Sequence, residues 1–312
     1  MRFGFGAGLA VLAALSLALG PGGAEAVEPE GQFVSVTGGR LHVVVLESRG
    51  KPSGSTLLLL HGASGNLKDL QESIGERLAA RHRVILVDRP GHGHSDRLGG
   101  REMSSPARQA DAISEALERL KVGRAVVVGH SWSGALATNL ALDHPSHVSG
   151  LVLISPGSHP YPGGAAWYNE IAATPLIGRA FASLIRPVAE KRFDDGLKSV
   201  FAPKPPPPDY VARTDAKLLL RPEEFVANAE DLVDFKRFVA AQYRRYDAIR
   251  VPTVIITADK DEIVSPEIHS RPLHRQIKGS KLVVLEGVGH TPHWNATDRV
   301  IREIEGVVAK AR

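Results

Sequence analysis

The sequence contains no cysteine, which excludes disulfide bonds, thiolate metal sites and a cysteine nucleophile. It also has little excess charge of one sign, since 38 Lys and Arg residues stand against 34 Asp and Glu residues. Nucleic-acid binding needs a concentrated basic face, and no basic run stands out, so no nucleic-acid partner is expected. Hydrophobic residues nevertheless make up 43% of the 312 residues, enough to bury a core. The chain is therefore expected to fold as one large domain or two small ones.

The long hydrophobic run of the sequence lies at the N-terminus, at residues 3–19. Arg2 precedes it, and the breakers at 20–23 and an A-x-A pattern at 24–26 follow. This layout is typical of a secretory signal peptide, so residues 1–26 are predicted to be cleaved and the protein to be periplasmic or secreted. The alternative is an uncleaved membrane anchor, because the run approaches the ~18 apolar residues of a short span. No later stretch is long and apolar enough, so no stable span is expected after cleavage.

Strand-like and helix-like segments alternate along much of the remaining chain. Two β-branched runs flank Gly38 and Gly39, which predicts a hairpin. The continuous apolar run at 56–60 predicts a strand buried on both faces, and apolar residues at helical spacing predict a helix over 67–81. Further strands are predicted at 84–87, 125–128, 151–154, 253–257 and 282–285, and further helices at 106–120, 134–142 and 300–308. The alternation predicts the α/β class, with a mostly parallel central sheet flanked by helices.

The alternation is interrupted between residues 157 and 248. This stretch contains Pro and Gly clusters, four consecutive prolines at 205–208 and several helical patterns. It is therefore predicted to be a helical insertion in a core made of residues 27–156 and 249–312.

The segment V-V-V-G-H-S-W-S-G at residues 126–134 joins a predicted strand to an Ala- and Leu-rich predicted helix. A serine on such a tight turn has its hydroxyl exposed at the carboxyl edge of the sheet, as a nucleophile needs. Gly129 permits the turn because a side chain there would collide across it. Ser133 stands where the usual G-x-S-x-G pattern has its second glycine. Ser131 is the candidate nucleophile, and the alternative is an ordinary strand-to-helix turn.

Other predicted strand ends carry the groups that a serine nucleophile requires. Asp261 and His290 follow the last two predicted strands, and an H-G-A loop follows the strand at 56–60. Because the carboxyl ends of parallel strands meet at one sheet edge, Ser131, Asp261 and His290 are expected to form a catalytic triad. The backbone N–H groups of Ala63 and Trp132 are expected to form the oxyanion hole.

Residues 32–310 resemble the α/β-hydrolase superfamily. The resemblance rests on the H-G loop, the G-H-S turn, a D-x-x-G-x-G-x-S stretch at 88–95, a D-x-x-V-x-P segment at 261–266 and a final G-x-G-H at 287–290. It implies the α/β-hydrolase fold, with the insertion at 157–248 as a helical cap that roofs the active site. It also implies that Asp261 is the triad acid, whereas Asp259 caps its loop. Some family members carry the acid after the preceding strand, but here that position is Ser155-Pro156.

The resemblance implies a serine hydrolase that cleaves a carboxylic ester of a small or medium-sized molecule through an acyl-enzyme, without metal or organic cofactor. A serine nucleophile argues against relatives of haloalkane dehalogenases and epoxide hydrolases, which carry aspartate at this turn. Two alternatives use the same triad: carbon–carbon bond hydrolysis of a diketone-like ring-cleavage product, and cofactor-free haloperoxidase or perhydrolase activity. A ligand receptor on the same fold is the alternative outside enzymes. The export signal favours the esterase.

Several other polar and aromatic residues have structural interpretations. The histidines do not repeat a metal-ligand spacing, so no metal site is predicted. His130 and His293 are expected to pack or form hydrogen bonds around the site, and Asp88 to satisfy backbone groups of its own loop. Trp132 is expected either to line an acyl pocket or to pack on its helix. Five aromatic residues of the insertion either form its core or line the pocket: Trp167, Tyr168, Phe181, Phe201 and Tyr210.

Overall fold

The computed structural model describes residues 29–50 and 55–311. The predicted signal peptide or anchor, residues 1–26, lies outside the described residues, so its export or anchoring role stays a prediction. Among the described residues, no helix combines the length and the apolar character needed to cross a membrane.

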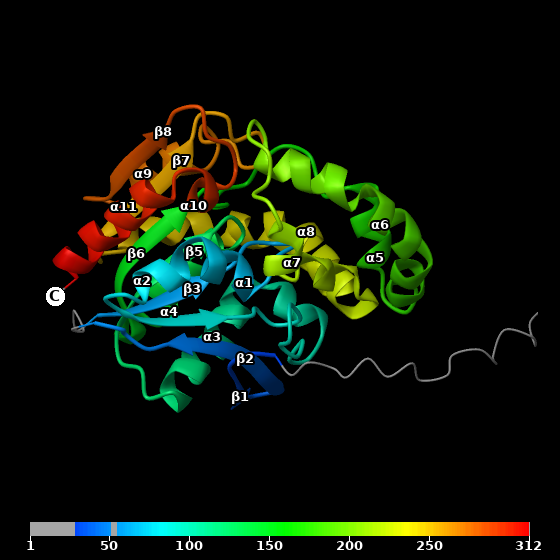
Figure 1. The fold of residues 1–312 in the computed structure, drawn as a ribbon, viewed down its shortest axis with the longest axis horizontal. Coiled ribbons are helices and arrows are strands. Elements are labelled where there is room, and N and C mark those ends of the chain that lie inside the picture. The colour runs from blue at the N-terminus through cyan, green and yellow to red at the C-terminus, as the bar shows by residue number, and fades with distance from the viewer. Residues whose placement is uncertain (1–28, 51–54, 312) are drawn as a thin grey trace, which may run out of the picture. The chain divides into compact units, whose positions relative to one another are not determined.

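The strands of the described residues form one eight-stranded sheet in the order β1-β2-β4-β3-β5-β6-β7-β8 (Figure 1). β1 pairs with β2, and β2 with β4, in antiparallel fashion, whereas every pairing from β4 to β8 is parallel. This confirms the predicted α/β-hydrolase fold with its mostly parallel sheet and N-terminal hairpin. The strands are β1 (Gln32–Val36), β2 (Gly39–Leu46), β3 (Thr56–Leu60), β4 (Arg83–Val87), β5 (Ala125–His130), β6 (Val148–Ile154), β7 (Thr253–Ala258) and β8 (Lys281–Leu285).

Successive side chains of a strand point to opposite faces of the sheet, so a strand between two helical layers must be apolar throughout. In β3, Leu58 and Leu60 belong to the core that contains residues of α3 (Pro106–Arg119), α4 (Ser133–Asp143) and α9 (Ser270–Gln276). Leu57 and Leu59 belong to the core on the other face, together with α11 (Thr297–Lys310). The apolar run at 56–60 is therefore buried on both faces, as predicted.

The helix predicted over residues 67–81 is confirmed over residues 67–78, but it is not α-helical throughout. The structure has α1 (Leu67–Leu70), a π-helical turn η1 (Gln71–Gly75) and α2 (Glu76–Leu78). Leu67, Leu70, Ile74 and Leu78 are all buried. The sequence did not predict the π-turn, because apolar spacing reports which side chains face the core, and a π-turn keeps that face while changing the backbone hydrogen bonds.

Between β6 and β7 the chain is helical and lies beyond the carboxyl ends of the strands (Figure 1). The helical insertion predicted at 157–248 falls here, and its boundaries as a domain stay a prediction. We call this segment the cap. Its helices are α5 (Trp167–Ala172), α6 (Gly178–Phe201), α7 (Tyr210–Arg213), η4 (Ala216–Leu220), α8 (Pro222–Gln242) and η5 (Tyr243–Ala248).

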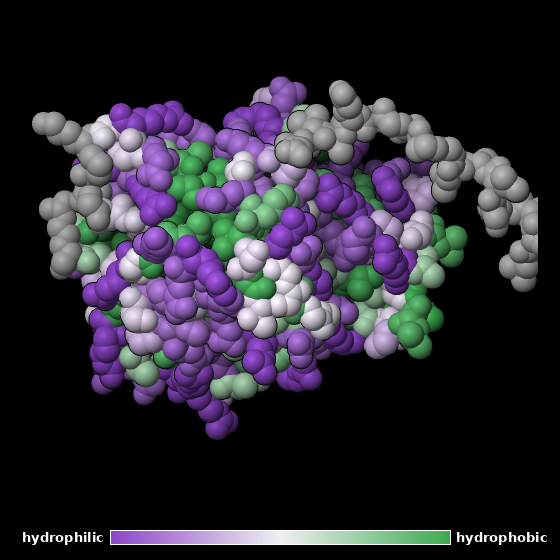
Figure 2. Space-filling view, turned by 90° about the horizontal axis from the view of Figure 1, so that it is seen from below, coloured by the Kyte–Doolittle hydropathy of each residue, from purple (hydrophilic) through white to green (hydrophobic). Residues whose placement is uncertain are grey.

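The surface in Figure 2 is largely hydrophilic, with hydrophobic side chains exposed near the middle of this face and at the end that α5 and α6 form. Among the large hydrophobic residues there, Leu176 is fully exposed and Leu184, Trp167 and Val188 are mostly exposed. The inner side of the cap, by contrast, closes over the carboxyl edge of the sheet. Helices η2 (Arg101–Ser104), η3 (Pro145–His147) and α10 (Pro292–Asn295) complete the fold.

Candidate active site

Ser131 occupies a strained turn between β5 and α4. Its φ of 53° lies in the left-handed region, which is unusual for a residue other than glycine. The Ser131 N–H donates to the Ile154 carbonyl at 2.9 Å, and its carbonyl accepts from the N–H groups of Gly134 and Gly157. A Cβ on Gly129 would lie 2.4 Å from the Ser133 carbonyl oxygen, so only glycine fits at that position. The turn therefore holds the serine hydroxyl out at the sheet edge, as the sequence predicts.

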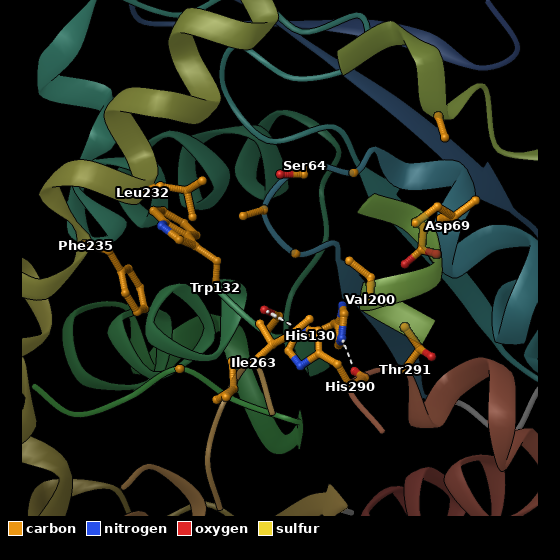
Figure 3. A pocket seen from close by; sticks show the side chains of 18 of the residues that line it. Ser64, Asp69, His130, Trp132, Val200, Leu232, Phe235, Ile263, His290 and Thr291 are labelled. Atoms are coloured by element: carbon orange, nitrogen blue, oxygen red, sulfur yellow. Dashed lines mark hydrogen bonds between the residues drawn. The ribbon is translucent and has the colours of Figure 1, made fainter. Parts of the chain in front are cut away.

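The structure brings Ser131, His290 and Asp261 together at the carboxyl edge of the sheet. Figure 3 shows His290 among the side chains that line the pocket beside them. The Ser131 Oγ lies 2.9 Å from His290 Nε2, and His290 Nδ1 lies 2.9 Å from Asp261 Oδ2. With the proton on Nδ1, the imidazole donates to the carboxylate and accepts from the serine hydroxyl. Ser131 follows β5, Asp261 follows β7 and His290 follows β8, so the carboxyl ends of three parallel strands of one sheet supply the three side chains.

Asp261 is held as an ionised carboxylate. The N–H groups of Ile263 and Val264 donate to its Oδ1 at 3.0 and 2.8 Å. Burial by itself raises the pKa of Asp261, but the hydrogen bond and charge of His290, with the Val264 N–H, outweigh it and lower the pKa below its ordinary value. Asp259 instead accepts from the Gly287 N–H at 2.7 Å and caps the loop, as the resemblance implied.

The backbone N–H groups of Ala63 and Trp132 border the same pocket as Ser131. Neither N–H donates to an acceptor within residues 29–50 and 55–311. Gly62 permits their close approach, because a Cβ there would lie 3.1 Å from the Ser131 Cβ. The Ser133 hydroxyl donates to the His61 carbonyl, so the residue that replaces the second glycine of the usual pattern connects the two turns.

His61 and Arg89 support the loop that carries Ala63. Burial first, and then the positive charge of Arg89, lowers the pKa of His61 to about 3, so its ring is neutral. Its Nε2 accepts from the Arg89 N–H at 3.0 Å, and its Nδ1–H donates to the Gly62 carbonyl at 2.8 Å. The Arg89 guanidinium donates to the same carbonyl at 3.2 Å and lies 4.2 Å from the Trp132 ring centroid.

Arg89 was not recognised from the sequence, because its main partner is far away along the chain. Its fully buried guanidinium pairs with Asp231 of α8 at 2.6 Å. The predicted structural role of Asp88 is confirmed, since its carboxylate accepts from the N–H groups of Leu67 and His94 at 2.8 and 2.9 Å. The D-x-x-G-x-G-x-S stretch thus both stabilises its loop and attaches the cap.

Core and cap together enclose a pocket of about 390 Å³ above Ser131, a size suited to a small or medium-sized molecule. No lysine or arginine is among the described residues that line the pocket. Asp69 is the carboxylate residue of this lining. The lining is Gly62, Ala63, Ser64, Gly65, Asp69, His130, Ser131, Trp132, Gly157, Tyr161, Phe193, Leu197, Val200, Tyr210, Ala216, Leu232, Phe235, Ile263, Val264, His269, His290 and Thr291.

The aromatic residues singled out in the sequence divide between several environments. Trp132 and Tyr210 line the pocket, and Phe201 is fully buried. Trp167 and Tyr168 are exposed, so neither expected role applies to them. The sequence did not reveal that these two residues are exposed, because aromatic side chains can also pack against each other at the surface. Here the ring centroids of Trp167 and Tyr168 lie 5.9 Å apart.

A buried polar cluster lies beside the triad. His130 Nε2–H donates to the His290 carbonyl at 3.0 Å, and His293 Nε2–H donates to Asp69 at 2.9 Å, so both histidines form the expected hydrogen bonds around the site. Asp69, His130 and His293 are close enough that their ligand atoms could surround a cation. The Asp69 oxygens, however, already accept hydrogen bonds from His293, Trp294 and Tyr210, the pattern of a polar network.

Comparison with known proteins assigns this chain to a family. Residues 55–297 match the family model described as alpha/beta hydrolase fold. Lipase 1 of Psychrobacter immobilis is 27% identical over 264 residues, which cover 82% of this chain and 77% of that protein. The 2-hydroxy-6-oxo-6-phenylhexa-2,4-dienoate hydrolase of Comamonas testosteroni is 28% identical over 263 residues, which cover 80% of this chain and 86% of that protein.

Solved structures give the same result. The esterase of Exiguobacterium antarcticum superposes with a TM-score of 0.70 at 25% identity, covering 89% of this chain and 99% of that one. A thermophilic esterase of Thermogutta terrifontis has a TM-score of 0.70 at 21% identity, covering 90% and 99% of the two chains. With a family model that spans most of its length, this chain belongs to the α/β hydrolase fold family and is a hydrolase.

Proposed function

We propose that this enzyme hydrolyses a neutral carboxylic ester of small or medium size through an acyl-enzyme on Ser131. The observation that carries the proposal is the continuous hydrogen-bonded chain from the Ser131 hydroxyl through His290 to Asp261, with 2.9 Å at each step. A serine hydroxyl is a weak nucleophile at neutral pH, and a neutral imidazole at this distance can remove its proton.

In the first half of the reaction, Ser131 Oγ attacks the ester carbonyl carbon and its proton passes to His290 Nε2. The negative charge then develops on the former carbonyl oxygen, beside the N–H groups of Ala63 and Trp132. Asp261 stabilises the imidazolium. Collapse of the tetrahedral intermediate breaks the bond to the alcohol oxygen, and His290 returns the proton to that oxygen.

In the second half, water attacks the acyl-enzyme while His290 takes a proton from it. Collapse of this second intermediate releases the carboxylic acid and returns the proton to Ser131 Oγ. Each oxyanion donor is expected to contribute ~10²–10³ in rate. These steps use residues of this chain and water alone.

Carbon–carbon bond hydrolysis is the second candidate, because the Comamonas testosteroni relative is named as a dienoate hydrolase. A dienoate carries a carboxylate, which is expected to need a cationic partner in an apolar pocket. No Lys or Arg is among the described lining residues, and Asp69 contributes a negative charge. The pocket therefore favours the neutral ester.

The experiment compares wild type with Ser131→Ala on a short p-nitrophenyl ester and on a dienoic ring-cleavage product. We expect ester turnover by wild type and a loss of at least 10³-fold in the variant, with the circular dichroism spectrum unchanged. A serine-reactive fluorophosphonate should label Ser131 in wild type. Near-normal activity of Ser131→Ala contradicts the mechanism, and preferential turnover of the dienoic substrate contradicts the substrate class.

Export remains part of the proposal, on the evidence of the N-terminal pattern. The intact mass of the exported protein should correspond to a chain that begins at Val27. A mass that includes Met1 would instead support the anchor.

A further inference from the structure

Asp69 is a buried charged residue for which the proposed reaction has no use. It lies in α1 at the edge of the pocket, and only 8% of its surface is exposed. Its Oδ1 accepts from Tyr210 Oη at 2.9 Å and from Trp294 Nε1 at 2.8 Å, and its Oδ2 accepts from His293 Nε2 at 2.9 Å. One carboxylate thus joins three elements: α1 of the core, α7 of the cap and α10.

On the core side, these bonds fix the segment that follows His290. His293 and Trp294 belong to α10, which begins two residues after His290. The His293 ring packs on His130 with 4.3 Å between centroids, and His130 holds the His290 carbonyl through its Nε2–H. Because His130 directly precedes Ser131, both partners of the proton transfer are held by groups that Asp69 anchors.

On the cap side, Tyr210 reaches Asp69 only when its segment is docked on the core. Its ring packs edge-on against Trp294, with 5.4 Å between centroids. The same segment is held on α1 and η1 by Asn66, which donates to the Thr214 carbonyl at 2.8 Å, and by the pair between Arg213 and Glu72 at 2.6 Å. Tyr210 also lines the pocket, so one residue of the cap reaches both the pocket and Asp69.

We propose that Asp69 is a positioning residue, which couples the docking of Tyr210 to the geometry of His290 and Ser131. This proposal rests on the proposed function. A carboxylate suits this role because it offers acceptors alone, and three donors point at it. An amide of the same shape replaces one acceptor by an N–H₂ group, so at least one of the three bonds must be lost or reversed in direction. Displacement of a reacting group by about 1 Å is enough to cost ~10²-fold in rate.

The test is a double-mutant cycle with Asp69→Asn and Tyr210→Phe, measured as kcat and KM on a short p-nitrophenyl ester that leaves most of the pocket empty. We expect Asp69→Asn to lower kcat about 10- to 100-fold and Tyr210→Phe about 3- to 10-fold, each with less than twofold change in KM. In the double variant, the effect of Tyr210→Phe should disappear, because it acts through Asp69. Arg213→Gln is the matched control: it loosens the same cap segment without touching Asp69, and kcat should stay within twofold of wild type.

Additive effects in the double variant, or an unchanged kcat in Tyr210→Phe, would overturn the coupling. A changed KM with wild-type kcat would make Tyr210 and Asp69 binding residues only. If Asp69→Asn does not fold, Tyr210→Phe against Arg213→Gln still decides. Fluorophosphonate labelling of wild-type Ser131 separates the two proposals: labelling without coupling contradicts only the role of Asp69, whereas absence of labelling contradicts the hydrolytic mechanism itself.

Discussion

The two long helices of the cap, α6 and α8, both line the pocket but are attached to the molecule in different ways. In α8, polar residues are buried and paired with the core. In α6, by contrast, three of its 24 residues are buried: Gly178, Ala182 and Phe201. On the α8 side, the pocket is therefore held to loops of the core by ion pairs. On the α6 side, it is lined by a helix that is largely exposed to solvent.

The attachment of α8 is electrostatic and lies directly beside the loop that carries Ala63, because Arg89 bonds to both the Gly62 carbonyl and Asp231. Asp231 pairs with Arg89 at 2.6 Å and with Arg97 at 2.9 Å, and all three side chains are largely or fully buried. Asp234 pairs with Arg101 through both oxygens, at 3.0 and 3.1 Å. Since removal of one partner leaves a buried charge uncompensated, these pairs strongly resist separation of α8 from the core.

The exposed character of α6 follows from its two apolar faces. Phe193, Leu197 and Val200 line the pocket, while Leu184 and Val188 are 79% and 62% exposed on the outside. A helix with a pocket on one side and solvent on the other gains little from packing. The comparison teaches that the contacts that stabilise the cap lie mainly in α8, next to Ser131. Substitutions in the apolar, largely exposed α6 can therefore change which substrates fit with little effect on stability.

The largest effect is expected where a charge of α8 is removed. Asp231→Asn leaves Arg89 buried without its carboxylate, so the free energy of unfolding should fall by about 3–5 kcal/mol. Urea denaturation measures this change. Asp195→Asn is the matched control on α6, where the exposed carboxylate lies 3.9 Å from Lys198, and its effect should stay within ~0.5 kcal/mol. Equal effects of the two substitutions would remove the distinction between the helices.

A smaller effect is expected from the titration of Glu224 at the start of α8. Burial is the main cause that raises its pKa to about 8. An acid whose pKa is higher in the folded than in the unfolded chain, where it is ~4.3, holds its proton more tightly when folded, so stability falls as pH rises between these values. Glu224→Gln should remove about 2.5 kcal/mol of the loss between pH 5 and pH 7. Parallel stability–pH curves for the two proteins would show that Glu224 is already ionised at pH 5.

The smallest effect on stability is expected on α6. Phe193→Ala enlarges the pocket, so the ratio of kcat/KM for long over short acyl esters should rise about tenfold. The free energy of unfolding should change by less than about 1 kcal/mol, because Phe193 is only partly buried. Leu184→Ala, on the outer face, should change neither quantity. If it altered acyl selectivity as much as Phe193→Ala does, the two faces of α6 would not be independent.

Much of the site was predictable because its signals are local. The V-V-V-G-H-S-W-S-G segment combines a strand, a glycine and a helix within nine residues, and strand ends identify His290 and the two carboxylates Asp259 and Asp261. Parallel strands bring such ends to one edge, so the spatial meeting of the triad follows from the chain order. The choice of Asp261 over Asp259 as the triad acid rested on the resemblance alone. The bond from the Gly287 N–H to Asp259 agrees with the loop-capping role that the resemblance implied for Asp259.

The sequence by itself determined the sheet, the turn at Ser131 and the residues that meet there, because short-range patterns of hydrophobicity and glycine encode strands, turns and their ends. Only the tertiary structure decided the pairing of Arg89 with Asp231 and the three bonds to Asp69, whose partners lie 141 to 225 residues away. Neither residue has a local signature, since a buried charge is stabilised by whichever distant group the fold brings to it. The π-helical turn at η1 was equally hidden, because the periodicity of buried side chains does not specify backbone hydrogen bonds.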